Sequence, residues 1–166
     1  MIIGVDFDGT VVTHDYPRVG KDIGAVPVLK KLVDCGNQLI LFTMRSSKNC
    51  TLQDAVNWFK ENGIKLYGVN TNPTQKDWTD SPKAHCHLYI DDAAFGAPLK
   101  FDGKLSGRPF INWTLAEKML EQYGAFDSEE SEPEDNYEDG DDENAVKICE
   151  KDLNEMVKQC VTKILK

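Results

Sequence analysis

The sequence predicts an α/β fold in which a parallel sheet has helices on both of its faces. Two observations indicate this fold. Almost continuous apolar runs, such as residues 2–5 and 39–42, are typical of strands that are covered on both faces, as in parallel sheets. Segments with the apolar spacing of helices separate these runs, which gives the order strand, helix, strand, helix, strand of βαβ units.

The first half of the chain alternates between the two kinds of element. Pro27 stands near the start of the first expected helix, and Gly36 follows its end as a C-terminal cap. Gly63 ends the second helix, in which Leu52 and Phe59 lie on the apolar stripe. The expected elements are strand 2–6, helix 26–35, strand 38–43, helix 51–61 and strand 66–69.

The second half of the expected domain is less regular. A polar loop over residues 70–80 leads to Ser81-Pro82-Lys83, which indicates the start of a short helix, and a strand follows at residues 87–90. Asp102-Gly103 predicts a hairpin. Thr114 and Glu117 form a capping-box pattern that opens a last helix, which ends near residue 123.

Composition divides the 166-residue chain into three parts. Residues 1–126 have the length and apolar content of one globular domain. Residues 127–144 hold eleven acidic side chains and no basic one, which predicts a disordered linker. Residues 145–166 recover helical spacing and predict an amphipathic helix. The net charge of −9 comes from the linker, because the remainder has seventeen acidic and nineteen basic residues.

The sequence predicts a cytoplasmic protein. Its five cysteines are odd in number and include no CxxC pair, which favours reduced thiols. No signal peptide precedes the first strand, and no apolar run approaches the roughly 20 residues that cross a membrane. We therefore expect no membrane partner. The nearly neutral domain and the acidic linker also argue against stable nucleic-acid binding.

Polar side chains gather where the strands of the expected sheet end. Asp6 and Asp8 follow the first strand, Thr43 ends the second, and Asp91-Asp92 follow the fourth. Ligands of open parallel sheets bind at this edge. Two carboxylates about 4 Å apart repel by roughly 4 kcal/mol at an effective dielectric constant of about 20. The pair Asp6 and Asp8 must therefore share a proton or hold a cation.

These residues resemble the motifs of the haloacid dehalogenase (HAD) superfamily of phosphotransfer enzymes. DFDGT, which begins at Asp6, is similar to its first motif, Thr43 to its second, Lys83 to its third and Asp91-Asp92 to its fourth. The resemblance covers approximately residues 1–123 and implies a three-layer, Rossmann-like (HAD-like) fold. Because neither the first nor the second motif is followed by a segment long enough for a cap domain, it implies a small capless member with an open site.

The resemblance implies a role for each matched carboxylate. Asp6 is the expected nucleophile, which becomes an aspartyl phosphate, and Asp8 is the expected general acid and base. Mg²⁺ is the expected cofactor. Its expected ligands are Asp6, Asp91 and the backbone carbonyl of Asp8, and Asp92 either adds a ligand or orients one.

The other matched residues are expected to bind the phosphoryl group. Thr43 offers a hydroxyl and is followed by backbone amides, and Lys83 supplies a positive charge. Lys76 is a rival for that charge, but it lies in the polar loop, whereas Lys83 leads directly into a strand. Arg45, just after the phosphate-binding turn, is the expected substrate-binding residue beside Thr43. Nothing in the sequence distinguishes His14.

The expected function is Mg²⁺-dependent hydrolysis of a phosphate ester, because the dehalogenases and ATPases of the superfamily lack an acid at the position of Asp8. A non-catalytic module that binds a phosphorylated ligand is the alternative. A phosphoacceptor signalling domain is less favoured, because its motifs occur in another order. The sequence names no substrate. We expect residues 145–166 to dock on their own domain or to join subunits of a homo-oligomer.

Overall fold

A parallel sheet forms the centre of residues 1–127, the part of the chain that the computed structural model describes. The four strands lie in the order β3-β2-β1-β4, and all three pairings are parallel. The α/β class and the parallel sheet are thus confirmed. The expected helix at residues 145–166 and all but the first residue of the expected linker lie outside the described residues. The strands are β1 (Ile2–Val5), β2 (Gln38–Leu41), β3 (Leu66–Val69) and β4 (Leu88–Ile90).

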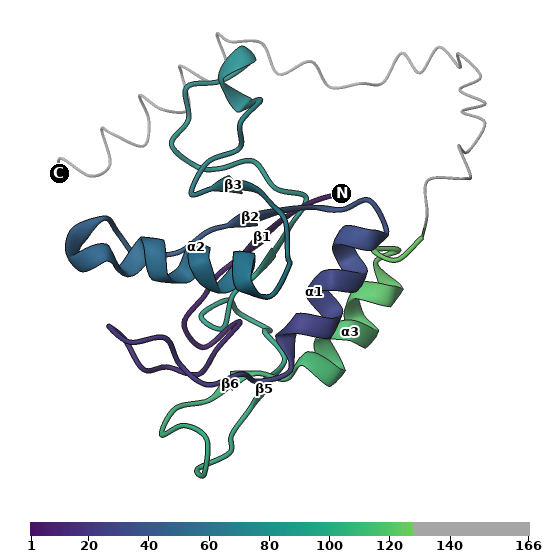
Figure 1. The fold of residues 1–166 in the computed structure, drawn as a ribbon. Coiled ribbons are helices and arrows are strands. Elements are labelled where there is room, and N and C mark those ends of the chain that lie inside the picture. Colours follow the sequence, from purple (N-terminus) through teal and green to yellow (C-terminus); the bar gives the residue numbers. More distant parts are fainter. Residues whose placement is uncertain (128–166) are drawn as a thin grey trace, which may run out of the picture. The chain divides into compact units, whose positions relative to one another are not determined.

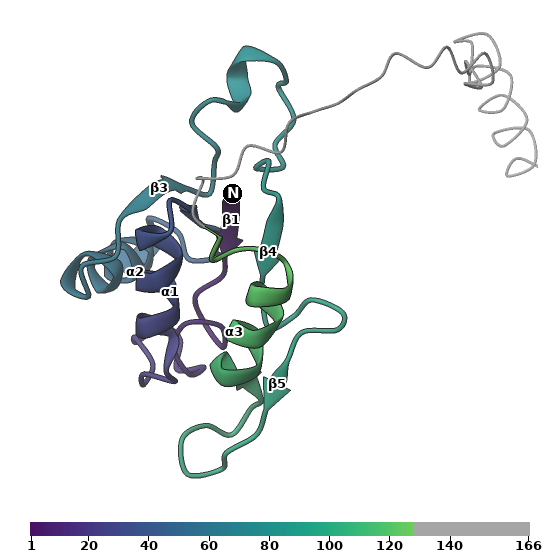
Figure 2. The same cartoon turned by 90° about the vertical axis from the view of Figure 1, so that its right-hand side faces the viewer.

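Three helices accompany the sheet, and two of them, α1 and α3, lie side by side (Figures 1 and 2). The helices are α1 (Ala25–Asp34), α2 (Thr51–Glu61) and α3 (Trp113–Gln122). Apart from the helix expected to start at residues 81–83, the ends of the expected helices and strands differ from the observed ones by at most two residues. None of the helices described within residues 1–127 is long and apolar enough to cross a membrane.

Short elements complete the described chain. Two turns of 3₁₀ helix are η1 (Lys48–Cys50) and η2 (Gln75–Asp77). The strands β5 (Leu99–Lys100) and β6 (Phe110–Ile111) pair in antiparallel fashion around the turn at Asp102, which confirms the predicted hairpin.

All three helices pack on one face of the sheet. Ile3 and Leu39 point toward that face and join Leu29 of α1, Phe59 of α2 and Trp113 of α3 in one buried core. Ile40, the strand neighbour of Leu39, is fully buried but does not belong to this core, because adjacent strand residues point to opposite faces. The prediction of helices on both faces is therefore wrong for residues 1–127.

The topology explains why the second face lacks a helix. Right-handed connections place α1 and α2 on the same face, whereas the connection from β3 back to β4 crosses the other one. That connection, residues 70–87, carries only η2, so the helix expected to start at Ser81–Lys83 is also wrong. It lies away from the three helices in both views (Figures 1 and 2).

A buried glutamine organises this irregular connection in place of a helix. The Gln75 side-chain amide donates to the carbonyls of Ser81 at 2.6 Å and Lys83 at 2.8 Å. Its side-chain carbonyl accepts from the backbone N–H of His85 at 2.7 Å. Three backbone groups are thus satisfied by one side chain, which is how a segment without secondary structure can cover a sheet face.

The N-terminus of α3 also differs from the prediction. Asn112, not Thr114, is the N-cap, and its side-chain oxygen accepts a hydrogen bond from the backbone N–H of Leu115 at 3.4 Å. Thr114 is exposed on the first turn. The capping-box pattern places the N-cap two residues late, because Asn is as good a cap as Thr and the local pattern does not distinguish the two.

We predict that Asn112→Ala lowers the free energy of unfolding by about 1 kcal/mol, because it removes the cap of α3. Thr114→Ala should change it by less than about 0.5 kcal/mol, as an exposed substitution away from a cap. Urea unfolding of both variants and the wild type measures the two differences. Equal effects of the two substitutions would contradict the observed cap.

Candidate functional site

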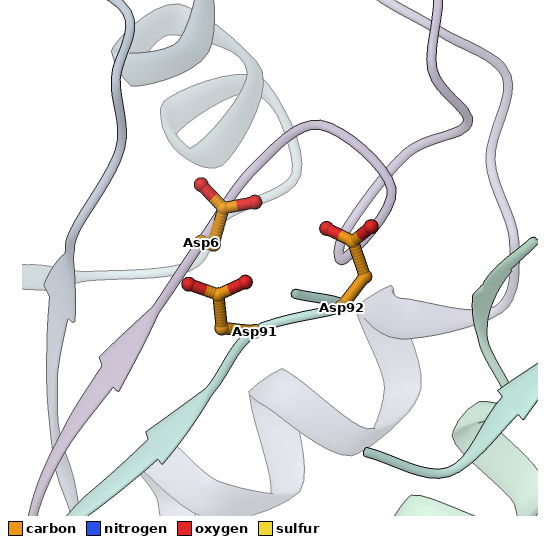
Figure 3. A group of neighbouring side chains, drawn as sticks. All are labelled: Asp6, Asp91 and Asp92. Atoms are coloured by element: carbon orange, nitrogen blue, oxygen red, sulfur yellow. The ribbon is translucent and has the colours of Figure 1, made fainter. Parts of the chain in front are cut away.

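Two neighbouring strands bring acidic residues together at the carboxyl edge of the sheet. Asp6 directly follows β1 and Asp91 directly follows β4, and the register of these strands places Val5 opposite Ile90. The backbone N–H of Asp6 donates to the Ile90 carbonyl at 2.9 Å and so extends the pairing by one residue. The carboxylates of Asp6 and Asp91 consequently lie side by side, where ligands of open parallel sheets bind (Figure 3).

Asp92 completes a group of three carboxylates. One oxygen from each of Asp6, Asp91 and Asp92 lies within 4.8 Å of the other two (Figure 3). All three residues are half-buried. No lysine or arginine of residues 1–127 forms a salt bridge with any of them. Three oxygen ligands without a lysine or arginine partner fit a hard divalent ion such as Mg²⁺.

The buried position of Asp6 changes its protonation. Burial first, and then the neighbouring charges of Asp91 and Asp92, raise the pKa of the Asp6 carboxyl from 3.8 to about 7. Hydrogen bonds from Phe7 and Thr10 act in the opposite direction but are outweighed. A carboxylate with this pKa is stabilised in its charged form when a cation takes the place of the proton.

Thr10 and His14 hold the third carboxylate in place. The Thr10 hydroxyl accepts the backbone N–H of Asp92 at 2.9 Å and lies 3.3 Å from an Asp6 oxygen. His14 Nε2 lies 3.1 Å from the Asp92 carboxylate oxygen Oδ2. Neither role was predicted from the sequence. No local signal marks His14, because its contact joins residues 78 positions apart.

A glycine makes room for the histidine. Gly9 has a φ of +88°, and a Cβ atom there would lie 2.2 Å from His14 Nε2 and 2.8 Å from Asp92 Cγ. The left-handed backbone turns the chain back after Asp8, and the missing side chain lets His14 reach Asp92. The glycine of the DFDGT motif is therefore the sequence feature from which this close packing could have been inferred.

Asp8 is held apart from the other acids by Arg45. The Arg45 guanidinium donates two hydrogen bonds of 2.7 Å, from Nε to Asp8 Oδ2 and from Nη2 to Asp8 Oδ1. The side-chain carboxylate of Asp8 is not part of the three-carboxylate group, and the metal ligand expected from Asp8, its backbone carbonyl, stays a prediction. Arg45, the residue expected to bind substrate, is 2% exposed. The structure therefore places these two residues against each other.

Thr43 lies at the same edge of the sheet, after β2. Its backbone N–H donates to the side-chain oxygen of Asn70 at 2.7 Å, and its hydroxyl accepts the backbone N–H of Arg45 at 3.2 Å. Because β2 is the neighbour of β1 on the side away from β4, Thr43 and Asp91 flank the Asp6 position. The expected position of Thr43 beside Asp6 is thus observed, and its binding of a phosphoryl group stays a prediction.

Lys83 is not in contact with the acids. It is exposed, precedes β4 by several residues, and has its Nζ atom 5.5 Å from the centre of the Tyr89 ring. Lys76, its rival, is exposed on η2. The structure thus brings Asp6, Asp91, Asp92 and Thr43 to one edge of the sheet, and it leaves both lysines outside any ion pair with the acids among residues 1–127.

Comparison with known proteins finds one informative relative. No family model matches the chain, and no curated protein matches it. Among solved structures, a conserved protein coded by a locus of Bacteroides thetaiotaomicron is 31% identical, with a TM-score of 0.61. The match covers 80% of this chain and 98% of that protein.

We predict that Asp6 destabilises the metal-free fold as pH rises. The pKa of Asp6 is about 7 in the folded protein and 3.8 in the unfolded chain. Its contribution to the free energy of unfolding is therefore complete below a pH of about 4 and is lost as pH rises through about 7, and the loss amounts to up to about 4 kcal/mol. The unfolding free energy of Asp6→Asn relative to wild type should therefore increase between about pH 4 and pH 8 in the presence of a chelator. Asp54→Asn, at an exposed position of α2, is the control. A pH-independent difference would contradict this prediction.

We also predict that Mg²⁺ stabilises the wild type more at about pH 8 than at about pH 5, because the ion competes with the proton on Asp6. Thermal unfolding with and without Mg²⁺ measures the effect. Asp6→Asn should be stabilised less than the wild type at the higher pH. Equal stabilisation of both proteins at both pH values would show that the ion binds elsewhere.

His14→Ala should weaken Mg²⁺ binding by roughly tenfold, because the residue that orients Asp92 is lost. Isothermal titration calorimetry measures the dissociation constant. His85→Ala is the control, since His85 is exposed on the connection from β3 to β4. If the His14 and His85 variants bind Mg²⁺ equally well, His14 does not orient a metal ligand.

Proposed function

The chain belongs to the same family as the conserved protein from Bacteroides thetaiotaomicron, and we propose that it is a Mg²⁺-dependent phosphohydrolase that forms an aspartyl phosphate on Asp6. The relative's name states no reaction, so the proposal depends on the site itself. The observation that carries it is the separation of four acids into two groups. Asp6 lies with Asp91 and Asp92, whereas Asp8 is held by Arg45.

This separation supports two different chemical roles for acids that are two residues apart. Asp6, in the three-carboxylate group, is the nucleophile: its oxygen bonds to phosphorus while the bond from phosphorus to the ester oxygen breaks. Asp8 is protonated when the ester binds; it gives that proton to the departing oxygen and becomes the carboxylate that accepts both hydrogen bonds from Arg45. In the second half it takes a proton from water, whose oxygen bonds to phosphorus as the bond to Asp6 breaks.

The remaining residues bind charge. Mg²⁺, held by Asp6, Asp91 and Asp92, would offset the repulsion between the Asp6 carboxylate and an anionic phosphate. Thr43 holds a phosphoryl oxygen with its hydroxyl, as its position beside β1 supports. Lys83 supplies positive charge to the phosphoryl group, and its exposed side chain is free of ion pairs within residues 1–127, so it can move toward the site.

The substrate is proposed to be large or variable in shape. Only a loop joins β1 to α1, and only η1, α2, β3 and the β3–β4 connection separate Thr43 from β4. No additional domain is inserted at either place in the described chain. An open site selects substrates through the loops at its rim and does not require that the substrate be enclosed.

A non-catalytic module that binds phosphorylated ligands is the second candidate. The observation that favours it is the position of Lys83, which contacts none of the three clustered acids. Such a module would bind inorganic phosphate or a phosphorylated ligand and would release it unchanged. It would not need Asp8, whereas a hydrolase with an acid and base does.

We predict that the purified protein releases inorganic phosphate from at least one member of a panel of sugar phosphates, nucleotides and phosphopeptides in the presence of Mg²⁺. Asp6→Asn and addition of a chelator should both reduce the rate to background, because the nucleophile or its cation is lost. Lys83→Ala should lower the rate, and Lys76→Ala should leave it unchanged. Phosphate release is measured colorimetrically, and acyl phosphate on Asp6 by mass spectrometry.

Asp54→Asn is the matched control for Asp6→Asn and should retain full activity. Binding of a panel member without its hydrolysis would support the non-catalytic module. Loss of activity in Lys76→Ala but not in Lys83→Ala would assign the positive charge to Lys76.

A further inference from the structure

Every hydrogen-bond donor of Arg45 is already used within the protein. A guanidinium has five N–H groups. Two donate to Asp8, and the other three donate to backbone carbonyls: Nη1 to Pro17 at 3.1 Å and Thr51 at 3.4 Å, and Nη2 to Arg18 at 2.7 Å. No donor is left for a phosphate oxygen. The expected role of Arg45 in substrate binding therefore requires that this network first break.

The surroundings of Arg45 also make it a fixed residue. Its side chain is 1% exposed, and its guanidinium carbon lies 4.9 Å from the centre of the Phe7 ring and 5.4 Å from that of the Tyr16 ring. A buried guanidinium needs a carboxylate partner, and the salt bridge of Arg45 within residues 1–127 is with Asp8. Because Phe7 belongs to the main core, the orientation of Arg45 is set by packing as well as by charge.

The network ties Arg45 to the loop before α1, which is 27 and 28 residues away in sequence, and to the start of α2. Pro17 and Arg18 belong to the loop between β1 and α1, and Thr51 is the first residue of α2. Arg45 itself follows Thr43, whose hydroxyl accepts its backbone N–H. A displacement of the loop at residues 16–18 is consequently transmitted to Asp8 through one side chain.

We propose that Arg45 is a positioning residue for Asp8: it fixes both carboxylate oxygens in one orientation and couples that orientation to the loop at residues 16–18. This inference rests on the proposed phosphohydrolase function for its kinetic consequences. Its structural consequence, the coupling of Asp8 to the loop, is independent of any activity. The bidentate geometry requires a guanidinium, so lysine cannot replace it despite its equal charge.

The kinetic test uses Arg45→Lys, Asp8→Asn and the double variant, with exposed Arg108→Lys as the matched control. Arg45→Lys should lower kcat by roughly 100-fold, as a misplaced catalytic group does, and should leave the inhibition constant of inorganic phosphate unchanged. In the Asp8→Asn background the same change should cost little further activity, because Arg45 acts through Asp8. Added guanidinium ion should partly restore Arg45→Ala.

Two results would overturn the kinetic part of the proposal. A phosphate inhibition constant that rises tenfold or more in Arg45→Lys would make Arg45 a phosphate ligand, since that ratio corresponds to the loss of a direct contact of about 1.4 kcal/mol. Equal losses from Arg45→Lys in the wild-type and Asp8→Asn backgrounds would make its role independent of Asp8.

The structural test is limited trypsin cleavage after Arg18, followed by mass spectrometry. The Arg18 carbonyl is tied to Arg45, so both Arg45→Lys and Asp8→Asn should speed this cleavage, and Arg108→Lys should not. Unchanged cleavage in both network variants would reject the coupling. A wild type that hydrolyses no phosphate ester would reject the proposed function, while accelerated cleavage in the same proteins would still support the coupling.

Discussion

Repulsion between carboxylates at the ends of β1 and β4 is the constraint around which the rest of the site is arranged. The parallel register places Asp6 beside Asp91, and Asp92 follows at once, so three acids share one small volume. Burial makes their charge still less favourable, as the raised pKa of Asp6 reflects. Such a group is retained only where a proton or a cation offsets it, and its position at the ligand-binding edge favours a cation.

The fourth acid avoids this repulsion because it has its own cation. Asp8 is two residues from Asp6, yet the turn at Gly9 and the buried guanidinium of Arg45 direct its carboxylate to a different partner. One pair of neighbouring acids thereby acquires two environments, one suited to a nucleophile beside a metal and one suited to proton transfer. Arg45 compensates the negative charge of Asp8, and a bound cation would compensate the negative charge of the three-carboxylate group.

The scaffold is asymmetric in a way that serves the site. α1, α2 and α3 cover one face of the sheet with the main core, while an irregular connection held by Gln75 covers the other. The core also reaches the site directly, because Phe7 lies between Asp6 and Asp8 in sequence and is fully buried against the helices. Its anchored ring keeps the strand end rigid where the acids diverge.

Local sequence determined the parallel sheet, the helix and strand ranges, and the gathering of Asp6, Thr43 and Asp91-Asp92 at one edge. Apolar runs, glycine stops and residues at strand ends are local patterns, and parallel strands necessarily end at the same edge. Three features depended on contacts between distant residues and were decided only by the tertiary structure: the lack of a helix on the second face, the pairing of Asp8 with Arg45, and the contact of His14 with Asp92. The partner of a charged side chain is chosen by proximity in space, and a local sequence pattern carries no record of that proximity.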